Sequence, residues 1–125
     1  MSGPSYFEIQ SDNPSAAAKF YEEVFGWKAE RDPNIPIEYW RLQTGGSMGA
    51  ILKRPVAVPQ GPSGTNAYVC SMEVADFDVS AQKILSLGGI VAMPKFAIPG
   101  KCWQGYFLDP DRNTFGLYQP DENAK

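Results

Sequence analysis

Residues 6–27 read YFEIQSDNPSAAAKFYEEVFGW, and this stretch decides the fold. Its first five residues alternate between two kinds of side chain, which predicts a strand over 6–10. Asn13 and Pro14 then mark a helix start, because asparagine caps free N–H groups and proline suits the first helical position. Apolar residues at helical spacing predict a helix over 14–25, which Gly26 ends. A second strand follows over residues 27–31.

The second half of the chain repeats this order. We expect a strand over 68–74, a helix over 78–87 and a strand over 90–93. Either Asp76 or Asp78 caps the second helix, and Gly88 follows its end. The separation between Asn13 and Asp76 nearly equals that between Gly26 and Gly88, which indicates an internal repeat.

Each half then continues with a predicted hairpin. The hairpin strands are expected over 38–42 and 48–52 in the first half, and over 104–108 and 115–119 in the second. Gly, Asn, Asp and Pro residues between them are typical of turns. Each half therefore has the order βαβββ. A second irregular stretch is expected over 95–101, where Pro99 and Gly100 suggest the border of a cavity.

These elements predict one α+β domain over residues 1–125. Module one spans about 4–54 and module two about 66–120. Residues 55–65 contain three prolines and two glycines, which is typical of an exposed linker.

The composition excludes several kinds of function. The chain has no histidine, so chemistry that needs an imidazole base or ligand is excluded. The net charge of −3, without a basic cluster, argues against nucleic acid as a partner. No apolar run has the length of a membrane span, and the N-terminus lacks the pattern of a signal peptide. Two separated cysteines are typical of reduced thiols, so we expect a cytoplasmic protein.

Two stretches carry a family resemblance. Residues 7–27 and the turn over 109–117, DPDRNTFGL, resemble the vicinal oxygen chelate superfamily of glyoxalase I, bleomycin-resistance proteins, fosfomycin-resistance enzymes and extradiol dioxygenases. The chain looks most like the branch of predicted enzymes related to lactoylglutathione lyase. The resemblance implies two βαβββ modules that form an incomplete mixed β-barrel with the helices outside. It also implies a ligand on the concave side, a divalent metal in many members, and homodimers.

The second stretch departs from the family at one position. Arg112 stands where relatives have glycine, and a positive φ would cost arginine about 1 kcal/mol. Either Arg112 is strained, or Asn113 takes the left-handed conformation instead.

The resemblance also locates the metal ligands, which relatives supply as His, Gln or Glu. In this sequence the four ligand positions fall on Tyr6, Gly49, Val69 and Gly116. Glycine and valine cannot bind a metal, and a neutral tyrosine binds one weakly. We therefore expect no metal and no cofactor.

An all-oxygen metal site is the alternative, built from Glu8, Glu38 and Glu73. Strand alternation turns these carboxylates inward, although solvated side chains at the barrel mouth would show the same pattern. Glu8 stands between aromatic neighbours, where burial would suit it to proton abstraction or cation binding. Glu8 and Glu73 are thus the candidate catalytic bases.

Alternation predicts a mostly aromatic ligand pocket, although aromatic side chains also fill cores. Its expected members are Tyr6, Trp40, Gly49, Ile51, Val69, Ser71, Gln104, Tyr106, Gly116 and Tyr118. Trp40 and Tyr106 are expected at equivalent positions of the two modules.

Three functions are compatible with these residues. The first is a metal-free protein that binds a small aromatic or cationic molecule without chemistry. The second is a divergent lyase or isomerase of the glyoxalase type, with Glu8 or Glu73 as base. The third is a structural or regulatory domain whose pocket is filled by side chains. In each case we expect a homodimer that binds neither nucleic acid nor a membrane.

Overall fold

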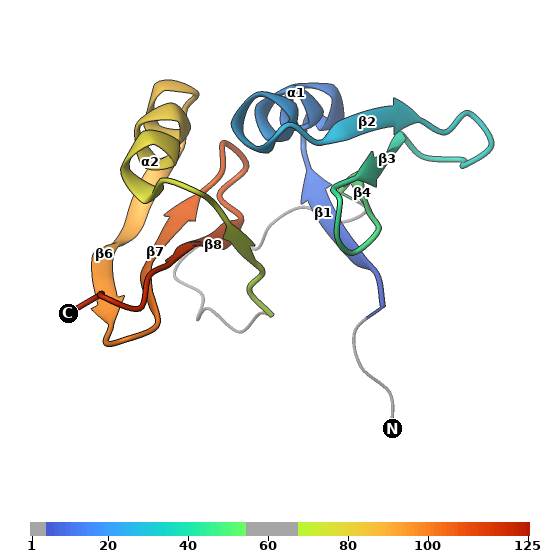
Figure 1. Ribbon diagram of the computed structural model, residues 1–125. Coiled ribbons are helices and arrows are strands. Elements are labelled where there is room, and N and C mark those ends of the chain that lie inside the picture. Colours follow the sequence, from blue (N-terminus) through green and yellow to red (C-terminus); the bar gives the residue numbers. More distant parts are fainter. Residues whose placement is uncertain (1–4, 55–67) are drawn as a thin grey trace. The chain divides into compact units, whose positions relative to one another are not determined.

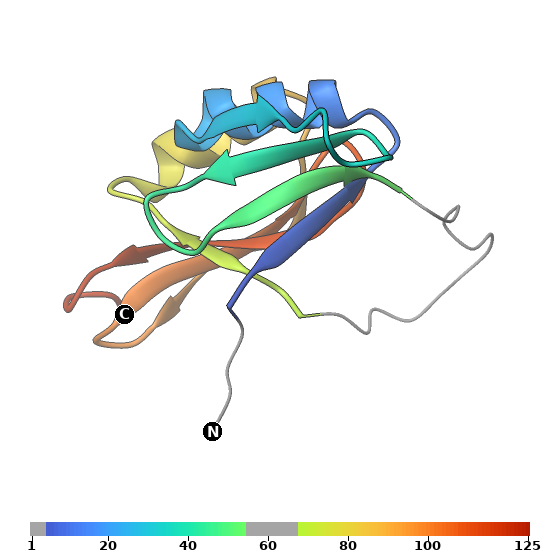
Figure 2. The same cartoon turned by 90° about the vertical axis from the view of Figure 1, so that its right-hand side faces the viewer.

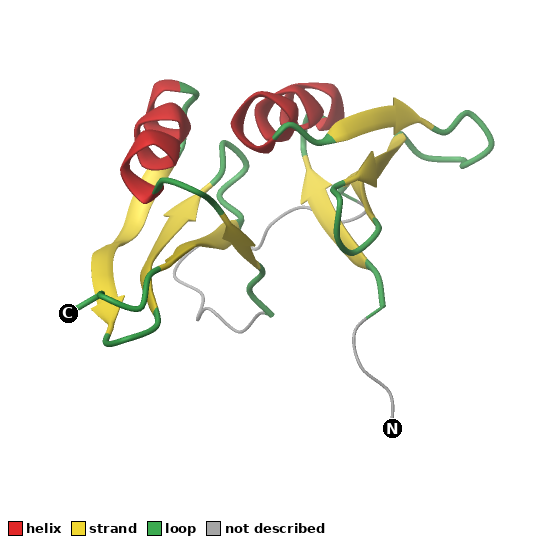
Figure 3. Ribbon diagram, viewed as in Figure 1, coloured by secondary structure: helices red, strands yellow, loops and turns green. Residues whose placement is uncertain are grey.

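The same secondary-structure order occurs twice in the chain (Figures 1 and 3). The computed structural model describes residues 5–54 and 68–125, so the predicted linker lies outside the described residues. The chain divides into two units, Met1–Gly61 and Pro62–Lys125, and each is described by itself.

Module one consists of β1 (Phe7–Ser11), α1 (Pro14–Phe25), β2 (Lys28–Arg31), β3 (Tyr39–Gln43) and β4 (Gly49–Lys53). The helix start is the predicted one, because the Asn13 side chain accepts a hydrogen bond from the Ala16 N–H at 3.3 Å and Pro14 follows it. Gly26 ends the helix with a φ of 74°, and its N–H donates to the Glu22 carbonyl at 2.8 Å. The helix predicted over 14–25 is confirmed.

Module two consists of β5 (Ser71–Glu73), α2 (Phe77–Ser86), β6 (Ile90–Ile98), β7 (Cys102–Leu108) and β8 (Thr114–Pro120). Asp76 caps α2 by accepting a hydrogen bond from the Val79 N–H at 3.1 Å. Helix α2 therefore begins one residue before the predicted start. Gly88 follows its end with a φ of 94°.

The two sheets have one topology. Their strand orders are β1-β4-β3-β2 and β5-β8-β7-β6, and the first pair of each sheet is parallel while the others are antiparallel. Figure 2 shows the four strands of module one side by side in this order. The predicted α+β fold of two βαβββ modules is confirmed.

Strand β6 corrects one expectation. Residues 95–98 were predicted to be irregular, but they continue β6 as far as Ile98. The pairing with β7 shifts between Val91 and Met93 and again between Met93 and Phe96. These irregularities accommodate Pro94, which lacks the N–H that regular pairing needs. Only the turn after Ile98, where Gly100 has a φ of 74°, matches the predicted irregular stretch.

Each sheet has a helix face, on which its own helix packs, and an opposite face that we call the open face. In module one the Phe7 ring lies 5.8 Å from that of Trp27, which stacks at 4.9 Å on Tyr21 of α1. Phe7 therefore points to the helix face. Since neighbouring strand residues alternate, Glu8 points to the open face.

Module two is arranged in the same way. The Phe77 ring of α2 lies 6.1 Å from Phe107, and a Cβ on Gly105 would approach the Phe77 ring to 2.6 Å. Phe107 and Gly105 thus belong to the helix face. Their neighbours Gln104 and Tyr106 belong to the open face.

Candidate functional site

Strand register corrects the predicted site in module one. Gly49 is the partner of Phe7 on the helix face, and Trp40 pairs with Ile51 two residues further along β4. Trp40, Gly49 and Ile51 therefore all lie on the helix face, and their assignment to the face of Glu8 is wrong. The predicted register was off by one residue, which moves every side chain to the opposite face.

Close packing confirms the position of Gly49. A Cβ at this residue would approach the Phe7 ring to 2.5 Å, closer than real Cβ atoms approach their neighbours. Gly49 is thus a glycine because an aromatic ring covers it, and it does not leave space for a ligand.

Ala50 is the residue of module one that corresponds to Gly116. Glu8 pairs with Ala50, and Ser71 pairs with Gly116, at the same distance before the two helix caps. Arg41 is the β3 partner of Ala50, and Tyr106 is the β7 partner of Gly116. The equivalent of Tyr106 is therefore Arg41 and not Trp40.

A chain of hydrogen bonds crosses the open face of module one. The Tyr39 hydroxyl donates to Glu8 Oε2 at 3.0 Å and lies 2.8 Å from the Tyr6 hydroxyl. Arg41 Nη1 donates to the Tyr6 hydroxyl oxygen at 3.4 Å. Because the single proton of Tyr39 goes to Glu8, Tyr6 is the donor to Tyr39. All donors of this chain thus point from the guanidinium of Arg41 toward the carboxylate of Glu8.

The environment of this chain keeps Tyr39 neutral. Burial, followed by the hydrogen bonds with Tyr6 and Glu8, raises the pKa of the Tyr39 hydroxyl far above its usual value. Arg41 lies 5.4 Å from the centre of the Tyr39 ring and pairs with Asp32 at 2.8 Å. The Asn34 backbone N–H, and then Arg41, lower the pKa of Asp32. Tyr39 is therefore a donor in this chain and not a base.

The glutamates of the predicted all-oxygen site do not gather in module one. Glu38 accepts a hydrogen bond at 3.0 Å from the indole of Trp40, a residue of the helix face. Glu8 lies on the open face, so the two carboxylates are on opposite faces of the sheet. Glu8 is exposed, so the burial expected to suit it to proton abstraction is absent. Within residues 5–54 and 68–125, no three His, Cys, Asp or Glu side chains are grouped to hold a metal ion.

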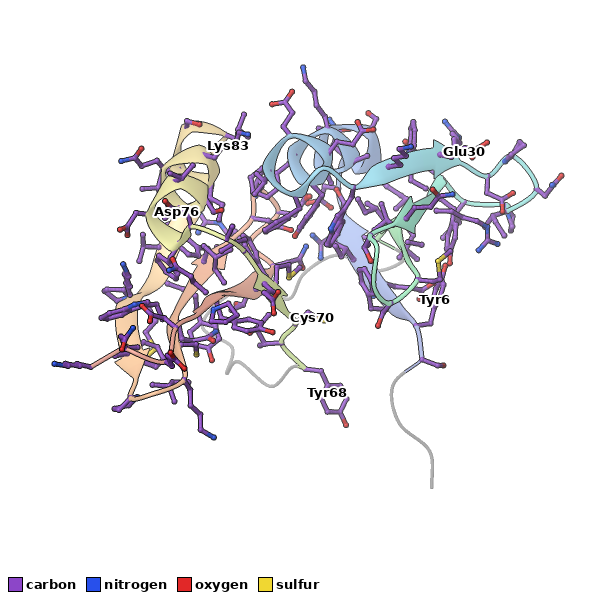
Figure 4. The ribbon with its side chains drawn as sticks, viewed as in Figure 1. Tyr6, Glu30, Tyr68, Cys70, Asp76 and Lys83 are labelled. Atoms are coloured by element: carbon purple, nitrogen blue, oxygen red, sulfur yellow. The ribbon has the colours of Figure 1, made fainter. Side chains whose placement is uncertain are left out.

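Module two collects most of its predicted site residues on its open face. Gln104, Tyr106, Gly116 and Tyr118 share that face by register with Ser71 and Glu73 of β5. Val69, just before β5, is 43% exposed. Figure 4 shows its neighbour Cys70 at the start of this strand, and Tyr6 at the corresponding start of β1.

Gly116 lies beneath a pair of polar side chains. Gln104 is 7% exposed, and its Nε2 donates to Ser71 Oγ at 3.2 Å. A Cβ on Gly116 would overlap Ser71 Oγ and approach Gln104 Nε2 to 2.9 Å. The absence of a side chain at Gly116 allows the serine and the glutamine to meet.

Glu73 and Tyr118 form a second pair on this face. The Tyr118 hydroxyl donates to Glu73 Oε1 at 3.0 Å. This hydrogen bond is the main cause that raises the pKa of Tyr118, followed by the charge of Glu73.

Sequence reasoning missed several residues of the open faces, among them Tyr39, Ala50 and Arg41 in module one and Phe96 and Cys102 in module two. Arg41 was missed because of the one-residue error in register. Phe96 stacks on Tyr106 with ring centres 6.4 Å apart, and Cys102 shares the face of Gln104. Phe96 fell in the stretch predicted to be irregular, although strand alternation running back from Ile98 would have indicated it.

The two modules contain equivalent hydrogen bonds. In module one Tyr39 of β3 reaches over Ala50 of β4 to Glu8 of β1, and in module two Gln104 reaches over Gly116 to Ser71. We call each of these cross-strand pairs a bridge. Both bridges lie over the residue at which the family resemblance expects a metal-binding carboxylate.

These residues do not fit a divalent metal of the family's kind. With the corrected register, the four ligand positions hold Tyr6, Ala50, Val69 and Gly116. Ala50 and Gly116 have no donor side chain, and each lies under a bridge. The carboxylates nearest to these positions are held by tyrosine hydroxyls.

Comparison with known proteins assigns the family. The model of the Glyoxalase/Bleomycin resistance protein/Dioxygenase superfamily matches residues 3–117. The chain belongs to this superfamily, which confirms the resemblance to the vicinal oxygen chelate group.

The curated relatives are longer proteins. The chain is 30% identical to the Putative glyoxylase CFP32 of Mycobacterium tuberculosis, over 96% of this chain and 46% of that protein. It is 25% identical to the Anthracycline biosynthesis protein DauV of Streptomyces sp., over 93% of this chain and 46% of that protein. The chain thus spans about half the length of the curated relatives it matches.

Solved structures share the fold. A glyoxalase/bleomycin resistance protein/dioxygenase family enzyme from Burkholderia phytofirmans PsJN is similar with a TM-score of 0.75 at 20% identity, over 94% of this chain and 98% of the other. The fosfomycin resistance protein FosX of Listeria monocytogenes has a TM-score of 0.70 at 16% identity, over 97% and 95% of the two chains. Neither helix of the described residues is long and apolar enough to cross a membrane.

Proposed function

We propose that this chain is a metal-free member of its superfamily that binds a small organic molecule on the open faces of its sheets. The observation that carries the proposal is the pair of bridges over Ala50 and Gly116. They occupy the positions where a carboxylate would hold a metal, and they present hydroxyl, amide and carboxylate groups instead. Polar groups set among aromatic rings are typical of small-molecule sites.

Accessible side chains on both open faces support this proposal. In module one Tyr6 is 42% exposed, and the Arg41 side chain is 52% exposed. In module two Ser71 is exposed, and Tyr106 and Tyr118 are half-buried. A ligand on either face would therefore meet ring surface and hydrogen-bonding groups together.

A metal experiment tests the first part of the proposal. The protein is purified without chelators, its metal content is measured, and its melting temperature is recorded with and without Ni²⁺, Zn²⁺ and Mn²⁺. We expect less than stoichiometric metal and no shift in melting temperature. A stoichiometric ion that raises the melting temperature would overturn the metal-free assignment, because a ligand specific to the folded state stabilises it.

A binding experiment tests the second part. Trp27, Trp40 and Trp103 all belong to helix faces, so their fluorescence is a poor reporter of the open faces. Ligand-detected NMR with a panel of small aromatic, cationic and neutral compounds is the suitable screen, followed by calorimetry. Trp40→Phe is the matched control, because Trp40 lies on the helix face. The proposal fails if no compound binds, or if a compound that binds is turned over.

The second candidate is a lyase or isomerase of the glyoxalase type. It is supported by the exposed positions of Glu8 and Glu73 and by the tyrosine hydroxyl that orients each carboxylate. The hemithioacetal of methylglyoxal and glutathione is the substrate to test. Turnover that is lost in Glu8→Gln or Glu73→Gln would favour this candidate over a binding protein.

A structural or regulatory role is the third candidate function. We also propose that the protein is a homodimer. Sedimentation equilibrium measures the oligomeric state. A dimer without any ligand in the screen would favour the structural role.

A further inference from the structure

The open face of module two has an unused hydrogen-bond acceptor. Gln104 is 7% exposed, and its Nε2 donates to Ser71 Oγ at 3.2 Å. No described residue donates to its Oε1. Every fully buried side-chain nitrogen or oxygen of the described residues has a hydrogen-bond partner, so Oε1 is not fully buried. The carbonyl oxygen of this buried amide therefore reaches the open face.

Ser71 supplies a donor next to this acceptor. Its oxygen accepts the hydrogen bond from Gln104, which leaves the hydroxyl hydrogen to point elsewhere. The Gln104 amide and the Ser71 hydroxyl thus lie side by side above Gly116, where a Cβ would displace Ser71 Oγ and Gln104 Nε2.

An aromatic surface borders this pair. Tyr106 is the β7 partner of Gly116, and its ring stacks on that of Phe96 with an angle of 28° between the ring planes. Both side chains are half-buried. The two rings in contact form an apolar surface beside the polar pair, against which the ring of a planar ligand can pack.

The charges on the two open faces differ. In module one Arg41, Asp32 and Glu8 are charged groups of the same network. In module two the groups around Gly116 are an amide, a hydroxyl and a phenol, and the nearest carboxylate, Glu73, is bound by Tyr118. This part of the face therefore favours an uncharged ligand.

We infer that the open face of module two binds a planar, uncharged aromatic molecule whose edge carries an N–H beside a carbonyl, as in a lactam. The ring lies against Tyr106 and Phe96, the ligand N–H donates to Gln104 Oε1, and the Ser71 hydroxyl donates to the ligand carbonyl. This inference rests on the proposed function and specifies its ligand class.

Two matched probes test the hydrogen bonds. 2-Quinolone has the lactam edge on a planar ring, and N-methyl-2-quinolone has the same ring without the N–H. Titration by calorimetry, or by NMR where binding is weak, gives the two dissociation constants. We expect N-methyl-2-quinolone to bind about tenfold more weakly, the effect of one lost hydrogen bond at a buried acceptor. Equal affinities would overturn the inference.

Variants locate the binding. Gln104→Met should weaken 2-quinolone about tenfold and reduce the difference between the two probes, because it removes the acceptor for the ligand N–H. Ser71→Ala should weaken both probes, because both carry the carbonyl to which Ser71 donates. Tyr106→Leu should weaken both probes equally, while Tyr106→Phe should not. Trp40→Phe is the matched control, because Trp40 lies on the helix face of module one, and it should leave both affinities unchanged. If Ser71→Ala leaves the binding of 2-quinolone unchanged, or Trp40→Phe weakens it, the site lies elsewhere and the inference is wrong.

The outcome separates the two proposals. If other compounds of the screen bind without metal and 2-quinolone does not, the ligand class is wrong while the proposed function stands. If no compound binds at all, both fail.

Discussion

Tyr39 joins two strands that are not neighbours, because its hydroxyl donates to Glu8 at 3.0 Å across the strand that carries Ala50. The bridge from Gln104 to Ser71 does the same over Gly116. Each bridge needs a small residue beneath it. The bridges are therefore compatible with Ala50 and Gly116 and would not be compatible with a carboxylate at these two positions. The predictions below follow from this arrangement and from the packing around it.

Placing a carboxylate at Gly116, one of the four ligand positions that the family resemblance locates, should destabilise the protein. In Gly116→Glu the new Cβ would overlap Ser71 Oγ and press on Gln104, at a cost of about 1–3 kcal/mol for overpacking. Urea denaturation measures the loss. The double variant Gly116→Ala with Ser71→Gly removes the main overlap and should be more stable than Gly116→Ala alone. If Gly116→Glu is as stable as the wild type and binds Zn²⁺, the bridge does not block the position.

Removing the hydroxyl of Tyr39 should weaken module one. Tyr39→Phe keeps the buried ring but takes away the donor to Glu8 and the acceptor for Tyr6, which costs about 0.5–1.5 kcal/mol. Tyr118→Phe is the control, because its hydrogen bond to Glu73 is exposed and should contribute less. Thermal unfolding compares the two variants. Equal losses would show that burial does not strengthen the bridge.

The stability of the protein should fall at alkaline pH in part because of Tyr39. The folded state raises the pKa of this hydroxyl above the usual value of 10.0, so the folded protein holds a proton that the unfolded chain loses. The resulting stability is complete below the unfolded pKa and is lost as the pH rises above it. Unfolding free energies at about pH 9 and about pH 11.5 measure the effect. In Tyr39→Phe the decrease between these values should be smaller than in the wild type, and an equal decrease would contradict the assignment.

Gly49 should tolerate no side chain. Gly49→Ala would drive a Cβ into the Phe7 ring and should destabilise the protein by about 1–3 kcal/mol. Gly46→Ala is the matched control, because the nearest atom to its Cβ would be Thr44 Oγ1 at 3.8 Å. Chemical denaturation of both variants gives the comparison. A small effect at Gly49 would mean that the Phe7 ring moves aside at little cost.

Replacing Arg112 by glycine should stabilise the folded protein. The sequence left open whether Arg112 or Asn113 takes the left-handed conformation, and Arg112 takes it with a φ of 67°. Arg112→Gly relieves a steric cost of about 1 kcal/mol, partly offset by the greater freedom of glycine in the unfolded chain. A higher melting temperature is the expected result. Arg112→Ala, which keeps the Cβ, should give no such increase.

The fold was predictable because its signals are local. Asn13 with Pro14, and Asp76 in the second half, mark helix starts through hydrogen bonds within a few residues of the cap. The same order of elements in both halves then identifies the repeat. Residues 95–98 were misjudged because Pro99 and Gly100 indicated an irregular stretch, whereas β6 continues past Pro94 to Ile98 with shifts in its pairing.

The candidate site was only partly predictable, because strand pairing is not local. Alternation within β1 indicated the face on which Glu8 lies, and the turn of the second hairpin indicated that Tyr106 and Gly116 share a face. The segment between Glu8 and Arg41 is two residues shorter than that between Ser71 and Tyr106, and no local signal fixes its length. Matching Trp40 to Tyr106 and Gly49 to Gly116 therefore gave a register that was wrong by one residue. No local pattern distinguishes Gly49, covered by Phe7, from a glycine left free for a ligand.

The bridges also bear on the kinetics of strand opening. Among the described strands, β1 and β5 are the terminal ones of their sheets, and each pairs through its main chain with one described neighbour. A terminal strand normally frays, and its amide hydrogens then exchange with solvent by local opening. Because Glu8 and Ser71 are tied to the third strand of their sheets, β1 and β5 can open only when the bridge breaks as well. The two side-chain bridges thus give the terminal strands a second attachment that main-chain pairing alone does not provide.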